Sequence, residues 1–268
     1  MIRNKAKKAV RKAKKAVKLV ARMLRKLAKS RASVPSKTKH EKNNWKRMSQ
    51  GGEFHFHLKN KWRQSPDFMG QTRTLFSHFG FSSDGWEGKT IIDLGAGSKL
   101  RTRYFAGAKI IAIEPLADRF MKEIQWCDLS DAEKVYSDPA EERIAECVKT
   151  ADLLISINVL DHCYDFEAII ENIAAYLKDD GLAFLSFDQH DEADEMHPLQ
   201  LTETICARVF AQKGLIVEKY SKGAGEILQT YGHADCMLNY WLKKAQQSSG
   251  ADAKQRSSLP RYAEVVVP

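Results

Sequence analysis

The feature of this sequence that most constrains its fold is an alternation of short apolar runs with helical patterns over its C-terminal two thirds. Helices are predicted around Met69–Phe79 and over Asp165–Leu177 and Leu201–Gln212, where apolar residues recur at helical spacing. Strands that alternate with helices predict a doubly wound α/β fold with a mostly parallel sheet. The predicted strands are Thr90–Leu94, Lys109–Ile113, Lys134–Tyr136, Leu153–Ile157, Leu182–Phe187, Leu215–Glu218 and a last one near Met237–Leu242.

Composition divides the 268-residue chain into four segments. Residues 67–244 carry the alternating pattern and are predicted to form one domain. Residues 1–31 form a basic arm, and residues 245–268, rich in Gln, Ser and Lys, are predicted to be a disordered tail. Residues 32–66 are predicted to be a polar linker and an aromatic segment that packs onto the domain or covers a pocket as a lid. The aromatic side chains in and beside this segment are Trp45, Phe54, Phe56, Trp62 and Phe68.

The positive charge of the chain is concentrated at its N-terminus. Residues 1–47 hold 19 Lys and Arg against one acid, Glu41, whereas the rest of the chain carries a net charge of −9. Apolar residues in the arm recur at alternating steps of three and four, which predicts an amphipathic helix from about residue 3 to residue 29. Such a helix suits an anionic membrane surface. The alternatives are a solvated tail, an acidic protein partner, and nucleic acid, which is disfavoured because no aromatic residue interleaves the charges.

Several classes of protein are excluded by simpler features. The chain has no apolar run of about 18 residues that could span a membrane, and its N-terminus lacks the apolar core of a secretory signal. Its five cysteines are scattered and form no C-x-x-C pair, which argues against a disulfide framework and a structural zinc site. A cytoplasmic protein with reduced cysteines is therefore expected.

A glycine-rich turn follows the first predicted strand. The strand Thr90–Leu94 runs into D-L-G-A-G-S-K, Asp93 to Lys99, where glycines let the backbone turn sharply and approach a ligand. A helix start after the turn is expected to offer free N–H groups to an anionic group. The second strand ends in Glu114, an acid that can accept both hydroxyls of a ribose. Leu100 stands where a dinucleotide-binding fingerprint needs its third glycine, which excludes that reading.

Residues 88–242 resemble the class I S-adenosylmethionine-dependent methyltransferases. The resemblance rests on D-L-G-A-G, on the acid Glu114, on V-Y-S-D after the third strand, and on I-N-V-L-D-H after the fourth. A helix and a glycine-led fifth strand follow in the order that the family shows. Lys99 departs from the family, because many members have a third glycine there.

The resemblance implies a fold, a cofactor and a set of contacts. The fold is a Rossmann-like, seven-stranded sheet, parallel except for one reversed strand, with S-adenosylmethionine at the carboxyl ends of the first strands. The residues implied to bind this cofactor are Asp93, Gly95, Ala96, Gly97, Glu114, Pro115, Asp138 and Asn158.

Candidates for the chemistry follow the fourth and fifth strands. The loop after the fifth strand holds Asp188, His190 and His197 among further acids, and His162 follows the fourth strand. A His–Asp pair is a suitable base for a sugar hydroxyl. The same cluster could instead be a solvated acidic loop or hold a divalent metal, although its spacing matches no metal motif. Arg101 and Arg103 could bind an anionic acceptor, the cofactor carboxylate, or only solvent.

The sequence therefore predicts a cytoplasmic methyltransferase held at the inner face of a membrane by residues 1–31. Its expected acceptor is a glycan, a lipid-linked saccharide or another small molecule, methylated on oxygen. One alternative is an RNA or protein methyltransferase that grips its substrate with the basic arm. Another is a binding module that retains the fold without catalysing transfer.

Overall fold

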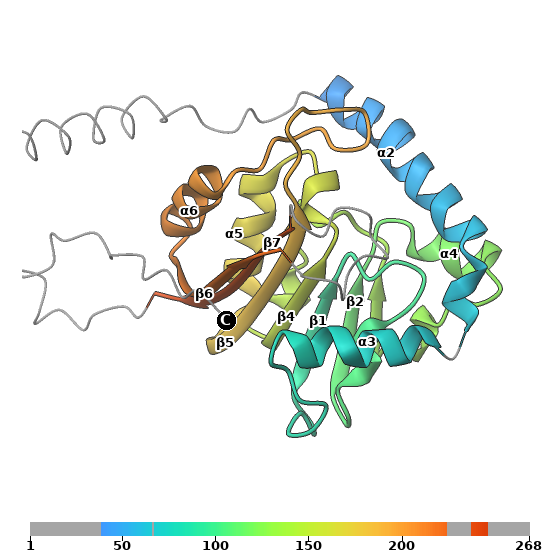
Figure 1. The fold of residues 1–268 in the computed structure, drawn as a ribbon, viewed down its shortest axis with the longest axis horizontal. Coiled ribbons are helices and arrows are strands. Elements are labelled where there is room, and N and C mark those ends of the chain that lie inside the picture. The colour runs from blue at the N-terminus through green and yellow to red at the C-terminus, as the bar shows by residue number, and fades with distance from the viewer. Residues whose placement is uncertain (1–38, 66, 224–236, 246–268) are drawn as a thin grey trace, which may run out of the picture.

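A computed structural model describes residues 39–65, 67–223 and 237–245 of the chain. Its centre is a seven-stranded sheet with the strand order β3-β2-β1-β4-β5-β7-β6 (Figure 1). The strands β1 to β5 pair in parallel, whereas β7 is antiparallel to both of its neighbours, β5 and β6. The predicted sheet, parallel except for one reversed strand, is confirmed. Its strands are β1 Thr90–Leu94, β2 Lys109–Ile113, β3 Lys134–Tyr136, β4 Ala151–Ile157, β5 Leu177–Asp188, β6 Leu215–Lys222 and β7 Met237–Lys244.

Four of the described α-helices connect or flank these strands. They are α3 Asp67–His78, α4 Ala117–Glu123, α5 Phe166–Tyr176 and α6 Glu203–Gln212. The last two begin at side-chain caps, because Asp165 accepts a hydrogen bond from the Ala168 N–H and Thr202 accepts one from the Ile205 N–H. Short 3-10 helices complete the connections: η1 Lys61–Gln64, η2 Arg101–Tyr104, η3 Leu129–Asp131, η4 Ala145–Cys147 and η5 Leu160–His162.

The sheet is covered on both faces. Successive residues of a strand point to opposite sides, so Ile91 packs in the cluster that includes α3, and Ile92 packs in the cluster that includes α5 and α6. The predicted apolar face of α5 is fully buried; it comprises Phe166, Ile169, Ile170, Ile173 and Tyr176. Burial on both faces is why the strands read as continuous apolar runs.

The segment read as a linker is largely helical. A helix, α2, spans Lys39–Lys59 and lies across one side of the domain (Figure 1). Its buried positions recur at helical spacing and are Trp45, Ser49, Gln50, Phe54 and His57. Polar residues on this face and the Gly51–Gly52 pair hide the pattern, because glycine disfavours helices and the stripe is barely apolar. The expectation that the aromatics pack on the domain holds for Trp45, Phe54 and Phe68, which are buried, whereas Phe56 is 46% exposed. The Trp62 side chain lies outside the described residues.

Two other predicted segments lie outside the described residues. They are the basic amphipathic helix within residues 1–31 and the tail over residues 246–268. Among the described helices, none combines the length and the apolar character that crossing a membrane requires. The described cysteines Cys127, Cys147, Cys163 and Cys206 are free, as expected for reduced thiols.

Candidate functional site

The glycine turn after β1 lies in a backbone conformation that other residues rarely adopt. Gly95 has φ +75° and Gly97 has φ +65°. The neighbours of the turn are close as well: a Cβ at Gly95 would lie 2.3 Å from Cγ2 of Val159, and one at Gly97 would lie 2.6 Å from Cε1 of His57. Both glycines are therefore required by dihedral angle and by space.

The turn is not followed by the α-helix that was expected to offer free N–H groups. Only η2 follows, and side chains already accept hydrogen bonds from the N–H groups before it. The Ser98 N–H lies 3.2 Å from Nδ1 of His57, and the Leu100 N–H donates to Oδ1 of Asp128 at 2.8 Å. Lys99, the departure from the family pattern, forms an ion pair with Asp128 at 2.9 Å. The loop is thus held by Asp128 at the point where the sequence departs from the family that it resembles.

Glu114, at the end of β2, closes the turn from the other side. Its Oε2 accepts a hydrogen bond from the Gly97 N–H at 2.9 Å, and its Oε1 accepts one from the Leu116 N–H at 3.0 Å. Burial raises the pKa of Glu114 to about 7, and these two hydrogen bonds oppose the shift. Each carboxylate oxygen keeps acceptor capacity for a further donor.

Asp93 holds the base of the turn. The hydroxyl of Thr102, in η2, donates to its Oδ2 at 2.6 Å. Burial raises the pKa of Asp93 to about 6, despite this hydrogen bond and the nearby guanidinium of Arg101. The carboxyl group therefore ties β1 to the segment after the turn.

These residues line one cavity at the carboxyl ends of the central strands. Of the predicted cofactor contacts, the cavity brings together Asp93, Gly95, Ala96, Gly97, Glu114, Pro115 and Asn158. Asn158 follows β4 in the left-handed region, with φ +58°, and its N–H donates to the Ser186 carbonyl at 2.7 Å. Asp138 is the exception: it is half-buried and does not line this cavity. Glu141, three residues further along, lines it instead, and burial raises the pKa of Glu141 to about 7.

One wall of the cavity is α2; an aromatic segment over a pocket was predicted here, but its helical form was not. Its lining side chains are Trp45, Ser49, Gln50, Glu53, Phe56 and His57. Burial lowers the pKa of His57 to about 2, with help from Arg63 and Arg101, so its imidazole is neutral. Because the Ser98 N–H points to Nδ1, the proton of the ring is on Nε2, which lies 3.9 Å from Oε2 of Glu53. The contact between His57 and the turn fixes α2 over the cavity.

Two guanidinium groups also line the cavity, those of Arg63, which is buried, and Arg101, which is partly buried. Arg101 lies over the Phe68 ring, with its Cζ 4.5 Å from the ring centroid, and Cζ of Arg63 lies 5.7 Å from the same centroid. Burial lowers the pKa of Arg101 to about 9 and that of Arg63 to about 10. A purely surface role for Arg101 is therefore wrong, whereas Arg103 is half-exposed and pairs with Asp128 and Asp131. Two cations at one cavity, one buried and one partly buried, favour an anionic ligand group.

The three predicted histidines gather in one cluster, which we call the acid–His cluster: Asp161, His162, His190 and His197. The His190 and His197 rings are stacked with centroids 3.8 Å apart, and the His162 and His197 centroids are 4.6 Å apart. Asp161, a buried residue of η5, lies with Oδ2 3.1 Å from Nε2 of His190. This hydrogen bond raises the pKa of His190. Sequence reasoning missed Asp161, although it stands in the L-D-H stretch that carries His162.

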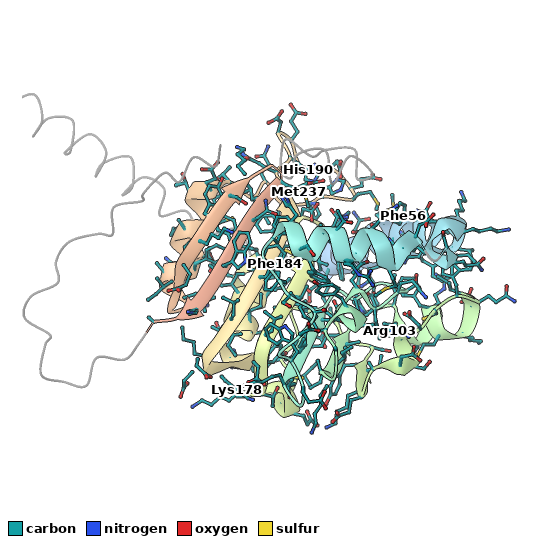
Figure 2. All side chains as sticks on the ribbon, turned by 60° about the horizontal axis from the view of Figure 1, so that its bottom comes forward. Phe56, Arg103, Lys178, Phe184, His190 and Met237 are labelled. Atoms are coloured by element: carbon teal, nitrogen blue, oxygen red, sulfur yellow. The ribbon has the colours of Figure 1, made fainter. Side chains whose placement is uncertain are left out.

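The cluster adjoins the cavity at one point. His162 lines the cavity, and its Nδ1 lies 3.7 Å from Oε1 of Glu53 on α2. His190, His197 and Asp188 are not part of the lining; Asp188 is buried at the end of β5. Figure 2 shows His190 and Phe56 on one side of the molecule and Lys178, near the start of β5, on the opposite side. The cluster and the cavity therefore share the carboxyl side of the sheet.

Comparisons with solved structures agree with this fold. A methyltransferase from Burkholderia thailandensis, solved with 1,6-didemethyltoxoflavin and S-adenosylhomocysteine, is 18% identical, with a TM-score of 0.53 over 80% of this chain and 93% of that one. A SAM-dependent methyltransferase from Aquifex aeolicus is 12% identical, with a TM-score of 0.50 over 72% and 96%. A phosphoethanolamine N-methyltransferase from Haemonchus contortus, solved with S-adenosylmethionine, is 14% identical, with a TM-score of 0.51 over 76% and 60%.

Sequence comparison gives the family directly. No curated protein sequence matches the chain significantly. A family model described as a methyltransferase domain matches residues 57–215, more than half of the chain. The positive-φ glycines, the acid Glu114 and the cavity between them fit the cofactor of that family. The chain belongs to the methyltransferase-domain family and is an S-adenosylmethionine-dependent methyltransferase of class I.

Proposed function

We propose that this methyltransferase acts on an oxygen atom of a small, hydroxyl-bearing acceptor, such as a membrane-associated saccharide. The observation that supports this is the contact between the cavity and the acid–His cluster at His162 and Glu53. An acceptor placed between them would face the cofactor on one side and imidazole and carboxylate groups on the other. Such groups suit the recognition of hydroxyls, which need both hydrogen-bond donors and acceptors.

The cofactor and the protein side chains have different tasks in this reaction. When bound, S-adenosylmethionine supplies a methyl group that its sulfonium already activates, so the protein contributes mainly by positioning the reactants. A hydroxyl must also lose its proton as it is methylated, and a side chain that accepts this proton accelerates the step. We propose that the predicted catalytic residues, His162, His190 and His197, accept it, and that Asp161 orients His190 through their hydrogen bond. Asp188, also predicted, contributes negative charge near His190.

Within the cavity, we propose that Asp93, Gly95, Ala96, Gly97, Glu114, Pro115 and Asn158 hold the cofactor. Glu114 would accept the ribose hydroxyls, and Arg101 would pair with the carboxylate of the methionine part. Asp138, the remaining prediction, is given no role because it does not line the cavity.

Affinity for S-adenosylhomocysteine is expected to decrease as the pH falls below about 7. The ionised Glu114 accepts hydroxyl hydrogens, and protonation turns one of its oxygens into a donor, so binding favours the ionised form. The free protein has a Glu114 pKa of about 7, so affinity should be constant at higher pH. It should fall by up to about tenfold per pH unit at lower pH. Calorimetric titrations from pH 5.5 to 8.5 check this, and a constant affinity over that range would contradict it.

The same pKa has the opposite effect on the stability of the unliganded protein. Because the pKa of Glu114 rises from an ordinary 4.5 to about 7 on folding, the folded state holds the proton more tightly. The contribution of Glu114 to the free energy of unfolding is therefore fully present below pH 4.5 and is lost as the pH rises through 7. Asp93, with a pKa of about 6, and Glu141, with a pKa of about 7, add contributions of the same sign. Ligand affinity and thermal stability should thus respond oppositely to pH.

Replacing Arg101 with glutamine is expected to weaken the binding of S-adenosylhomocysteine about 10- to 100-fold. The reason is that a charge-assisted hydrogen bond to the carboxylate of the ligand is lost. 5′-Methylthioadenosine lacks that carboxylate and keeps the ribose, so its affinity should be nearly unchanged in Arg101→Gln. Both ligands can be compared by calorimetry. A parallel loss for both would mean that Arg101 supports the cavity generally, through Asp93 and Phe68, and would contradict the assignment.

Residues 1–31 are proposed to hold the enzyme at an anionic membrane surface, on the cytoplasmic face. The support is the sequence of the arm, with 14 Lys and Arg and no acid on a predicted amphipathic helix. The full chain should float with vesicles that contain anionic lipid, and a chain lacking residues 1–31 should not. Neutral vesicles and high salt are the controls, since both remove the electrostatic attraction. A full-length protein that remains unbound at low salt would contradict this part of the proposal.

Transfer of a radiolabelled methyl group from S-adenosylmethionine into separated lysate fractions tests the acceptor class. Label in the saccharide or lipid-linked saccharide fraction is expected. Label in RNA or in protein would replace the proposal by one of the two macromolecular substrates. Binding of S-adenosylhomocysteine without transfer to any fraction would favour a module that retains the fold only. A Glu114→Gln chain is the background control.

A further inference from the structure

We propose that Asp161, His190 and His197 form a binding site for a divalent transition-metal ion of the zinc type. Each of the three side chains can offer one ligand atom, and these atoms lie within 4.8 Å of one another. Asp161 comes from η5 after β4, whereas both histidines come from the loop after β5. The fold therefore brings one carboxylate and two imidazoles together from separate segments. The inference does not depend on the identity of the acceptor.

Asp161 is buried as a metal-binding carboxylate would be. Its side chain is only 1% exposed, and Oδ2 faces Nε2 of His190 at 3.1 Å. The other oxygen, Oδ1, is buried and has no hydrogen-bond partner among the described residues. A buried carboxylate oxygen without a partner is costly, and native structures rarely keep one without a reason. A cation between Asp161 and the imidazoles would compensate this carboxylate.

His197 is held in the orientation that a ligand requires. Its Nδ1 lies 3.1 Å from both carboxylate oxygens of Asp194. Oδ1 of Asp194 also accepts hydrogen bonds from the N–H groups of Met196 and His197, which fixes the turn. A carboxylate on Nδ1 keeps the proton there and leaves the lone pair on Nε2 for a metal, the usual arrangement around metal-bound histidines. Asp194 is thus a positioning residue for the site.

The loop that carries both histidines is anchored to the rest of the domain. The Met196 carbonyl accepts a hydrogen bond from the Ser49 hydroxyl, at 3.2 Å, and also lies 3.2 Å from Nδ1 of His162. A Cβ at Gly52 would lie only 2.5 Å from Sδ of Met196. The absence of a side chain at Gly52 therefore allows α2 to approach the loop. A preorganised loop lowers the cost of assembling a ligand set.

The ligand set selects the metal and leaves a position open. Two imidazole nitrogens with one carboxylate oxygen suit Zn²⁺, Co²⁺ or Fe²⁺ rather than Mg²⁺ or Ca²⁺, which prefer oxygen ligands. The side chains of His190 and His197 are 17% and 23% exposed, so the cluster is reached from solvent. Three protein ligands with an open position are typical of catalytic rather than structural zinc. An acceptor hydroxyl at that position would lose its proton more readily. His162 would receive that proton, because His190 and His197 would use their lone pairs on the metal.

The test measures metal binding by the full-length protein in the absence of cofactor and acceptor. A negative result would therefore count against the metal site alone and not against the proposed methyl transfer. After treatment with a chelator, the protein is titrated with Co²⁺, followed by its visible absorption, and with Zn²⁺ by calorimetry. One ion per chain is expected. His197→Gln and Asp161→Asn should each weaken binding at least about 100-fold, and Asp194→Asn about 10-fold, because it only positions His197.

The matched control is His78→Gln, which changes an exposed histidine at the end of α3 and should leave binding unchanged. Unfolding temperatures without metal show whether each variant is folded, and His197→Gln serves if Asp161→Asn is not. Absence of saturable binding at one equivalent would overturn the proposal. Binding that His190→Gln and His197→Gln leave intact would overturn it as well.

Discussion

Replacing Gly95 with alanine is expected to abolish detectable binding of S-adenosylhomocysteine. The added Cβ would lie 2.3 Å from Cγ2 of Val159, and Gly95 has φ +75°, so the substitution is unfavourable in space and in backbone conformation. Val159 lines the same cavity and follows β4, so the clash displaces either the turn or the opposite wall. The increase in unfolding temperature that the ligand produces in the unmodified protein should be lost.

The matched control for this prediction is Gly214→Ala. Gly214 has nearly the same dihedral angle, φ +72°, but a Cβ there would have nothing within 4 Å. In Gly214→Ala, backbone strain should lower the free energy of unfolding by only about 1–2 kcal/mol, and the variant should bind the ligand normally. If Gly95→Ala matches Gly214→Ala both in ligand binding and in unfolding temperature, the close contact with Val159 does not explain the need for glycine at position 95.

Replacing Glu114 with glutamine should weaken the binding of S-adenosylhomocysteine and of 5′-methylthioadenosine equally, by about 100-fold or more. In the proposed binding mode, two charge-assisted hydrogen bonds to the ribose would be lost or weakened, each contributing about 1.5–3 kcal/mol. The glutamine NH₂ group would also face the N–H of Gly97 or of Leu116, because both carboxylate oxygens accept such a bond. Two donors that face each other repel, so the turn should loosen as well.

Calorimetry with both ligands distinguishes this result from that of Arg101→Gln, which should affect only the ligand with a carboxylate. Glu123→Gln is the control, since Glu123 is exposed on α4 and pairs only with Arg119 among the contacts found for it. Normal affinity in Glu114→Gln would show that the acid after β2 does not contact the ribose. The pH dependence predicted for the unmodified protein should also disappear in this variant.

The grouping of most predicted cofactor contacts around one cavity could be anticipated, because it depends on the ends of neighbouring strands. Parallel strands place their carboxyl ends at one edge, so Asp93 and Gly95 after β1, Glu114 after β2 and Asn158 after β4 converge without any knowledge of packing. Asp138 does not line the cavity; it follows β3, a short strand at the edge of the sheet. Glu141 lines the cavity instead.

The acceptor side was predicted only as a collection of residue types. His190 and His197 were expected near an acceptor, but no local pattern indicated that they stack on each other or meet His162. Asp161, which meets His190, stands beside His162 in the L-D-H stretch after the fourth strand, and nothing local distinguishes it there from other acids. Its burial depends on how η5 packs against the loop after β5, and neither periodicity nor spacing reports such a contact.

The helix α2 illustrates the same limit. Its buried face contains Ser49, Gln50 and His57, whose low hydropathy resembles that of a linker. These side chains are buried because the cavity and the loop after β5 offer hydrogen-bond partners, such as Ser98 for His57 and the Met196 carbonyl for Ser49. Polar burial of this kind is stable only when its partners are already in place.

By itself, the sequence determined the order and type of the strands, the glycine turn and the acid that follows β2. These features depend on local dihedral preferences and on the apolar runs of strands buried on both faces. The tertiary structure decided which polar groups meet: His57 over Gly97, Arg63 with Arg101, and Asp161 with His190. Their energies arise only when distant segments pack together and exclude water, so no single stretch of sequence contains them.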